Sequence, residues 1–259
     1  MRKTIDQIGR HLQYTFPPKK IISLAPALTE TMYDLGLEEE IVGRTRFCIH
    51  PHDKVKHAVN IGGTKDIKID RIHKLNPDLI ISEKEENTKE IVEELEKHYP
   101  VYVFEVQTVT DVFGMMTDLG QITNRNEQAQ NRIKDIKKSI ENLPHAQGKR
   151  VAYVIWKRPY MVVGKNTYIQ SLLEQMGFIN PFTSYEGRYP EVTEMDLKKA
   201  NLDYLFLATE PYPFREKDIT PMAELLPGVQ PMIVDGEMFW YGVKIIEAVP
   251  YFNRLFSHL

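Results

Sequence analysis

The sequence has only one cysteine, Cys48, among its 259 residues, so no disulfide can form within the chain and packing alone must hold the fold. It has no apolar run near the length of about 18 residues that a membrane-spanning helix needs. Its formal net charge is only −3, which gives no overall attraction to nucleic acid or to an anionic membrane. We therefore expect neither nucleic-acid binding nor a membrane span.

The first twenty residues lack the features of a secretory leader. They contain no apolar central stretch, no small-residue cleavage site and no cysteine that could carry a lipid. If Met1 is the native start, the sequence predicts a cytoplasmic protein.

Common catalytic and metal-binding motifs are absent as well. The sequence has no G-x-S-x-G elbow, no H-E-x-x-H motif and no G-x-G-x-x-G after a predicted strand, and residues 62–65 lack the spacing of a phosphate-binding P-loop. Cys48, His50 and His52 are ligand types that suit zinc or copper, but Pro51 interrupts them and no second ligand pair follows. We interpret this segment as an ordinary loop and expect no enzyme activity, no metal site and no covalent cofactor.

What the sequence does contain is a weak internal duplication. In each half, a short apolar segment is followed by a loop with proline, a predicted helix and a glycine, and a later short helix leads through Asn-x-Asp into another apolar segment. A pattern repeated at nearly constant spacing indicates two lobes of one design. The matched pairs are the strands 20–24 and 150–155, the helices 28–35 and 168–176, the helices 69–75 and 194–200, the strands 79–81 and 204–207, and the strands 101–104 and 232–234.

Strands that alternate with helices predict parallel sheets with right-handed crossovers. Between the two halves, residues 109–143 have apolar side chains spaced by three or four, which is typical of an amphipathic helix. Gly120 and residues 124–126 could break this helix, but the duplication on either side favours one continuous helix. We therefore predict an α/β fold of two Rossmann-like lobes with parallel sheets, joined by one long rigid helix. The predicted parts are an N-terminal lobe (1–108), an interlobe helix (109–143) and a C-terminal lobe (144–259).

Aromatic side chains recur in predicted loops at the ends of strands. Flat rings give a large apolar contact area at a low entropic cost, as a bulky planar ligand would require. Basic residues in the same loops could pair with carboxylate or phosphate groups on a ligand. The candidate ligand-binding residues of these two kinds are Phe47, Trp156, Tyr160, Tyr189, Trp240 and Tyr241, with Arg46, Lys65 and Arg158.

Glu83 is a further candidate, because it follows a predicted strand at the point where open α/β sheets bind ligands. An acidic residue there is equally explained as the start of a helix.

Two alternatives to a binding protein remain. A metal-dependent enzyme on the same scaffold would need Glu83, Glu210 and Glu237 to converge with His50 or His52, and a cytosolic sensor of a metal cofactor would need a protein partner.

The chain resembles the class III solute-binding proteins, the cobalamin-, haem- and siderophore-binding partners of ABC importers that are also called helical-backbone metal receptors. The resemblance covers nearly the whole chain from Phe16 onward, and its first-lobe pattern is the more specific. The matching segments are IISLAPALTE (21–30), LGL (35–37), IVGRT (41–45), Phe47-Cys48 with Pro51, IGG (61–63), IDRI (69–72), LNPDLI (75–80) and YPEVT (189–193).

The resemblance implies two lobes joined by one long helix, with a metal chelate (cobalamin, haem or a ferric siderophore) in the cleft between them. It implies that Phe47 and Tyr189 flank the ligand and that Tyr160 and Trp240 line the cleft. Glu83 stands where cobalamin binders carry an aromatic residue, which implies a more polar cleft.

The resemblance also implies that an ABC permease dimer docks through one acidic residue on each lobe. Asp70 matches the first. Met195 stands at the second position, so Glu194 or Asp196 would have to replace it. If residues preceding Met1 are missing, the resemblance implies a periplasmic protein. We expect a monomer.

Overall fold

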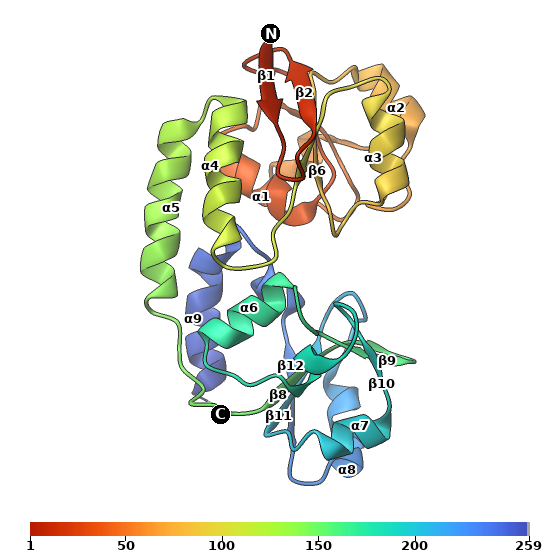
Figure 1. Ribbon diagram of the computed structural model, residues 1–259, viewed down its shortest axis with the longest axis vertical. Helices are drawn as coiled ribbons and strands as arrows, with labels where there is room; N and C mark the ends of the chain where they lie inside the picture. Colours follow the sequence, from red (N-terminus) through yellow and green to blue (C-terminus); the bar gives the residue numbers. More distant parts are fainter. Residues whose placement is uncertain (258–259) are drawn as a thin grey trace. The chain divides into compact units, whose positions relative to one another are not determined.

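The computed structural model describes residues 1–257 and divides into two compact units. The first unit comprises residues 1–106 and 110–137, and the second comprises residues 107–109 and 138–259. The last two residues of the predicted C-terminal lobe, 258 and 259, lie outside the described residues. Each unit contains a five-stranded sheet covered by helices, which confirms the predicted α/β fold with two sheet-containing lobes (Figure 1). Over residues 1–257, no helix combines the length and apolar character needed to cross a membrane.

The sheet of the first unit is parallel throughout, in the order β5-β4-β3-β6-β7. One face of this sheet packs against α2 and α3 through a cluster of aliphatic side chains, and α1 and α4 lie on the other face (Figure 1). The strands are β3 (Ile21–Ser23), β4 (Ile41–Arg44), β5 (Val59–Asn60), β6 (Leu79–Glu83) and β7 (Val101–Phe104), and the helices are α1 (Pro26–Asp34), α2 (Ile69–Leu75), α3 (Lys89–Glu96), α4 (Asp111–Thr123) and α5 (Asn126–Ile140), with a 3-10 turn at Val55–His57.

An antiparallel hairpin of β1 (Arg2–Ile5) and β2 (His11–Tyr14) precedes this sheet and was not predicted. Its turn covers the edge strand β7: the amide of Gln7 donates to the carbonyl of Val103 at 3.2 Å, and the carboxylate of Asp6 accepts from the amide of Val103 at 3.3 Å. The hairpin therefore gives hydrogen-bond partners to backbone groups that an edge strand would otherwise expose.

The sheet of the second unit has the order β10-β9-β8-β11-β12. The prediction of parallel strands is confirmed for β8, β11 and β12, and β9 and β10 extend the sheet as antiparallel strands. Helices α7 and α8 cover one face and α6 and α9 the other (Figure 1). The strands are β8 (Val151–Lys157), β9 (Tyr160–Val162), β10 (Glu191–Val192), β11 (Tyr204–Ala208) and β12 (Gln230–Val234), and the helices are α6 (Tyr168–Gln175), α7 (Glu194–Lys199), α8 (Ile219–Leu225) and α9 (Lys244–Phe256), with 3-10 turns at Pro181–Ser184, Glu216–Asp218 and Gly236–Phe239.

The predicted duplication is visible in atomic detail at the ends of helices. Gly36 and Gly177 follow α1 and α6 with positive φ of 77° and 72°. In both helices, the amide of the glycine donates to the carbonyl three residues earlier in the chain. The amide of the residue after the glycine donates to the carbonyl five residues before that residue. This paired pattern requires a left-handed residue after the helix, which glycine adopts without strain.

The repeated Asn-x-Asp sequence also has the same role in both units. Asn76 and Asn201 have positive φ of 47° and 48° and end the short helices α2 and α7. The carboxylate of Asp78 accepts from the amides of the two residues before β3, at 2.8 and 3.0 Å. The carboxylate of Asp203 likewise accepts from the amide of the residue before β8, at 2.8 Å. Each aspartate thus joins the entry of one parallel strand to the entry of its neighbour.

The prediction of one long helix over residues 109–143 is wrong. The segment forms two helices, α4 and α5, which are separated at Asn124 with φ of 60°. A left-handed residue ends α4, and α5 then packs beside it (Figure 1). A side chain at Gly120 would bring a Cβ within 2.6 Å of the Cβ of Ala129, so the glycine is what allows the close approach. The boundary between the two units falls inside α5, between Lys137 and Lys138.

The two glycine caps differ in the space around them. We expect Gly36→Ala to lower the free energy of unfolding by about 1–2 kcal/mol, the cost of left-handed backbone for an L-residue, because a Cβ there meets nothing within 4 Å. Gly177→Ala should cost more, because its Cβ would lie 2.3 Å from the ring of His145. Urea unfolding of each variant beside the parent protein measures both effects, and equal losses would contradict the role of His145.

Candidate functional site

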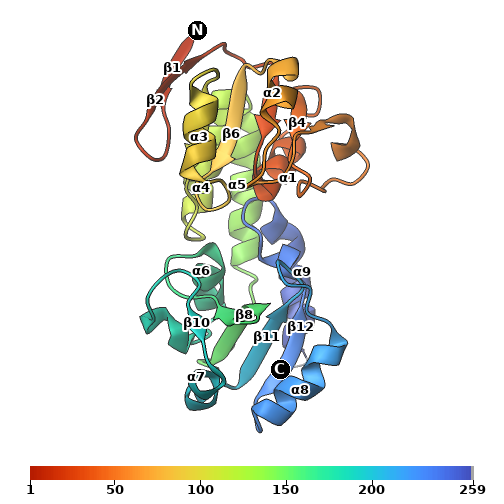
Figure 2. The same ribbon diagram turned by 90° about the vertical axis from the view of Figure 1, so that its right-hand side faces the viewer.

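In the first unit, the loops that follow the strands gather at one edge of the sheet, because all five strands are parallel (Figure 2). The carboxyl edge of an open α/β sheet is the usual place for a ligand. The structure brings four predicted site residues to this edge: Arg46 and Phe47 follow β4, Lys65 follows β5 and Glu83 is the last residue of β6.

Phe47 and Arg46 form an exposed platform on this edge. Phe47 is 48% exposed, and the guanidinium carbon of Arg46 lies 4.9 Å from the centroid of its ring. A Cβ at Gly63 would lie 3.0 Å from Nη2 of Arg46 and 3.4 Å from the ring, so the glycine leaves room for the stack. The carboxylate of Asp66 is 3.9 Å from Arg46, and both groups are exposed, so this ion pair holds Arg46 only weakly. The platform offers an apolar face beside a positive charge.

Lys65 is exposed, and its charge acts on an acidic neighbour. Burial raises the pKa of the Glu86 carboxyl, Glu85 adds to the rise, and Lys65 opposes it. Glu86 is half-buried. The acidic segment after β6 is therefore not a fully exposed run of charges, as its sequence alone would suggest.

Glu83 lies at the expected edge, but its carboxylate holds the backbone of the loops. Only 2% of the residue is exposed. Oε2 accepts from the amides of Glu85 and Glu86 at 2.7 and 3.0 Å, and Oε1 accepts from the amide of Val106 at 3.4 Å. Burial raises the pKa of Glu83 to about 7, although the two amides of its own loop oppose the rise. The carboxylate of Glu83 is therefore buried beneath the surface of the loops, and it joins the segment that follows β6 to the segment that follows β7.

In the second unit, Trp156 near the end of β8 is 40% exposed. Tyr212 follows β11 and packs edge-to-face on it, with ring centroids 5.6 Å apart. Tyr212 was not predicted as a site residue, although Pro211-Tyr212-Pro213 directly after a predicted strand was a usable signal. Arg158 is exposed in the turn between β8 and β9, and Tyr160 on β9 is half-buried.

Trp240 and Tyr241 follow the 3-10 turn after β12. The indole Nε1 of Trp240 donates to Oε1 of Glu210 at 2.5 Å. A Cβ at Gly236 would lie 2.4 Å from Cγ of Glu210, so the glycine makes room for that carboxylate. The ring of Tyr241 meets Tyr168 edge-to-face at 6.0 Å. Glu210 thus orients an indole that the sequence had singled out.

Tyr189 occupies a different kind of position. It precedes β10, and the carbonyls of Arg188 and Pro190 on either side accept from the amides of Gly164 and Val162. Tyr189 therefore lies before a strand that pairs antiparallel with β9, and does not lie at the carboxyl end of a parallel strand as Phe47 and Glu83 do.

The candidate docking residues lie in the first turns of two equivalent helices. Asp70 is exposed on α2, and Glu194 is exposed as the first residue of α7. Asp196 caps α7 instead: its carboxylate accepts from the amide of Thr193 at 2.8 Å and from the hydroxyl of Tyr185 at 3.3 Å. These hydrogen bonds, led by those from Thr193, lower the pKa of Asp196. Of these two residues, Glu194 is exposed and Asp196 is half-buried in the helix cap.

The side chains that a metal-dependent enzyme would need are placed as follows. Over residues 1–257, no group of three or more His, Cys, Asp or Glu side chains is placed to hold a metal ion. Glu83 and Glu210 are engaged as described above, and the rings of His50 and His52 pack on each other with centroids 4.4 Å apart. Cys48 is buried next to the hydroxyl of Thr29 at 3.0 Å, and burial raises the pKa of its thiol, which makes the thiol unreactive.

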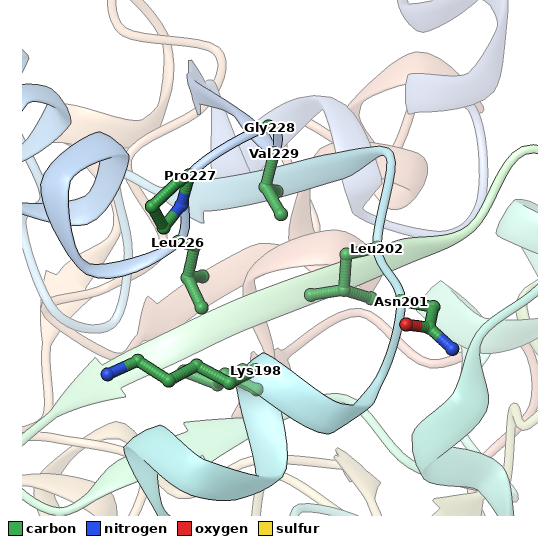
Figure 3. A pocket seen from close by; sticks show the side chains of 8 residues that line it. Lys198, Asn201, Leu202, Leu226, Pro227, Gly228 and Val229 are labelled. Carbon is green, nitrogen blue, oxygen red and sulfur yellow. The ribbon is translucent and has the colours of Figure 1, made fainter.

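A hollow of about 390 Å³ in the second unit lies at the opposite end of the sheet (Figure 3). Leu202 and Val229 in its wall precede β11 and β12, so the hollow is at the amino edge of these strands. It therefore shares no residue with the candidate site. The lining residues are Leu197, Lys198, Asn201, Leu202, Leu226, Pro227, Gly228 and Val229.

The raised pKa of Glu83 predicts a pH dependence of stability. Its carboxyl binds a proton more readily in the folded protein than in the unfolded chain, so its contribution to stability falls as the pH rises from 4.5 to about 7. The loss is about 3 kcal/mol by linkage. Glu83→Gln should flatten this slope in urea unfolding between pH 5 and 8. Glu93→Gln, on the exposed side of α3, is the control, and an unchanged slope in Glu83→Gln would contradict the assignment.

Comparison with known proteins agrees with the fold. A family described as periplasmic binding protein matches residues 21–226. The vitamin B12-binding protein of Pectobacterium atrosepticum is 23% identical over 233 residues, which cover 86% of this chain and 76% of that protein.

Two solved structures show the same fold. The periplasmic vitamin B12 binding protein BtuF of Vibrio cholerae has a TM-score of 0.75 at 20% identity, covering 94% of this chain and 98% of that one. The periplasmic heme-binding protein BhuT, in complex with two hemes, has a TM-score of 0.77 at 20% identity, covering 92% and 98%. Because the matching family spans most of the chain and reaches into both units, the chain belongs to the periplasmic binding protein family.

Proposed function

We propose that the chain is a non-enzymatic solute-binding protein for a metal chelate, either cobalamin, haem or a ferric siderophore, held without a covalent bond. Membership of the family supports binding without chemistry. The relatives named above for vitamin B12 and heme support the ligand class.

The observation that carries the proposal is the exposure of Phe47 and Trp156, one in each unit, beside strand ends. Single exposed apolar residues are common on proteins, but these two are 48% and 40% exposed and have Arg46 or Tyr212 packed against them. Covering the exposed half of such a ring would contribute about 2 kcal/mol. A broad planar ligand would gain this contribution at each ring that it covers.

The charges at the edge of the first unit favour a chelate with anionic groups. Arg46 stacks on Phe47 and forms a weak, exposed ion pair with Asp66, and Lys65 is exposed nearby in the chain. Both remain able to pair with ligand carboxylates. Glu83 supports the edge from beneath. The remaining proposed contacts are Arg158, Tyr160, Tyr189, Trp240 and Tyr241.

We further infer that the protein acts as a monomer in ABC-type uptake, in the periplasmic compartment of its family. The exposure of Asp70 and Glu194 at the starts of α2 and α7 supports docking to a permease dimer through one acidic residue on each unit.

Titration of the purified protein with cobalamin, haem and a panel of ferric siderophores tests the function directly. We expect saturable binding at about micromolar affinity or tighter to one of them, seen as quenching of the fluorescence of Trp156 and Trp240 and as a change in the visible spectrum of the ligand. Absence of binding to every one of them, with an intact circular-dichroism spectrum, would reject the proposal.

Phe47→Ala and Trp156→Ala test the aromatic contacts. Each should weaken binding about tenfold or more, because about 2 kcal/mol of ring burial is lost. The visible spectrum of the ligand is the readout, since Trp156→Ala removes a fluorophore. Val59→Ala and Ile179→Ala are matched controls, because these apolar side chains are also 43% and 47% exposed but neither follows a strand end. Equal affinity in all four variants would show that the rings do not contact the ligand.

A further inference from the structure

Asn87 lies between β6 and α3 and is only 5% exposed. The oxygen of its carboxamide accepts from the hydroxyl of Ser82 at 2.9 Å and from the amide of Glu83 at 3.0 Å. These two bonds fold the loop that follows β6 back onto the end of its own strand.

The nitrogen of the same carboxamide reaches two other loops. It donates to the carbonyl of Leu24 at 3.3 Å and to the carbonyl of Thr64 at 3.1 Å. Leu24 is the first residue after β3, and Thr64 lies in the loop after β5. One buried side chain therefore connects the loops that follow three different strands.

The loop that contains Thr64 also supports the Phe47 platform. The amide of Arg46 donates to the carbonyl of Gly62 at 2.7 Å, and the amide of Gly63 donates to the carbonyl of Asp66 at 2.7 Å. Gly63 lies directly against the Arg46–Phe47 stack. A continuous path of short contacts thus runs from Asn87 to the exposed ring.

We propose that Asn87 is a positioning residue for ligand binding: its carboxamide holds the strand-end loops of the first unit at the spacing that presents Phe47 and Arg46 to the ligand. The proposal rests on the proposed binding function. An aspartate has the same shape but no donor, so it would leave both carbonyls unpaired. Buried polar groups without partners are strongly unfavourable.

A change that only destabilises the unit must be separated from a change that misplaces the loops. Thr88 is the matched control, because it is the next residue and its hydroxyl accepts from the amide of Ile91 at 3.4 Å to cap α3. Thr88→Ala removes a helix cap and leaves the bonds between the strand-end loops in place.

The test compares Asn87→Asp, Thr88→Ala and the parent protein in titrations with the ligand from the panel that the parent binds best. We expect Asn87→Asp to weaken binding about tenfold or more and Thr88→Ala to change it less than about threefold. Unchanged binding by Asn87→Asp, or an equal loss in Thr88→Ala, would overturn the positioning role.

Two further measurements keep the test decisive. If Asn87→Asp does not fold, Ser82→Ala removes a single bond to the carboxamide and should weaken binding about threefold, and no loss would overturn the proposal. If the parent protein binds none of the panel, the proposed binding function is rejected, and hydrogen exchange at residues 62–66 tests the positioning role by itself. The amides of these residues should exchange faster in Asn87→Asp than in Thr88→Ala. Equal exchange rates would overturn the positioning role.

Discussion

The loops of the first unit depend on hydrogen bonds from two buried side chains, because short parallel strands leave their backbone without ladder partners as soon as they end. Asn87 supplies these bonds to the loops after β3, β5 and β6, and Glu83 supplies them to the segments after β6 and β7. Because buried side chains bond to these backbone amides and carbonyls, the outer surface of the edge can carry apolar and cationic side chains.

In the second unit, charged side chains connect the segments that follow the strands. Glu210 after β11 holds the indole of Trp240 after β12. At the end of β8, the ammonium of Lys157 pairs with Asp218 at 2.5 Å, and the same carboxylate accepts from the amide of Arg215. This arrangement ties the segment that carries Tyr212 to the strand that carries Trp156. In each unit, a buried polar group under the edge thus supports an exposed ring on it.

The raised pKa of Glu83 goes together with a supporting role of its carboxylate in the loops. A perturbed carboxyl at a strand end is often a sign of an active site, and burial raises the pKa of Glu83 to about 7. Its oxygens, however, are directed at backbone amides, which is the geometry of a support for a loop. Binding through stacking and charge pairing needs a fixed surface more than a titrating group.

The sequence by itself determined the duplicated α/β organisation, the glycine ends of α1 and α6, the Asn-x-Asp entries and the positions of Phe47 and Trp156 at strand ends, because these follow from periodicity and from conformations that few residues adopt. Only the tertiary structure decided that β9 and β10 run antiparallel, that Asn124 divides the central helix, that Glu83 is buried and that Asn87 joins three loops. The strand directions, the burial of Glu83 and the contacts of Asn87 depend on residues far apart in the chain, about which local patterns carry little information. The break at Asn124 has a local signal in Gly120 and residues 124–126, but the close approach of Gly120 to Ala129 is seen only in the folded chain.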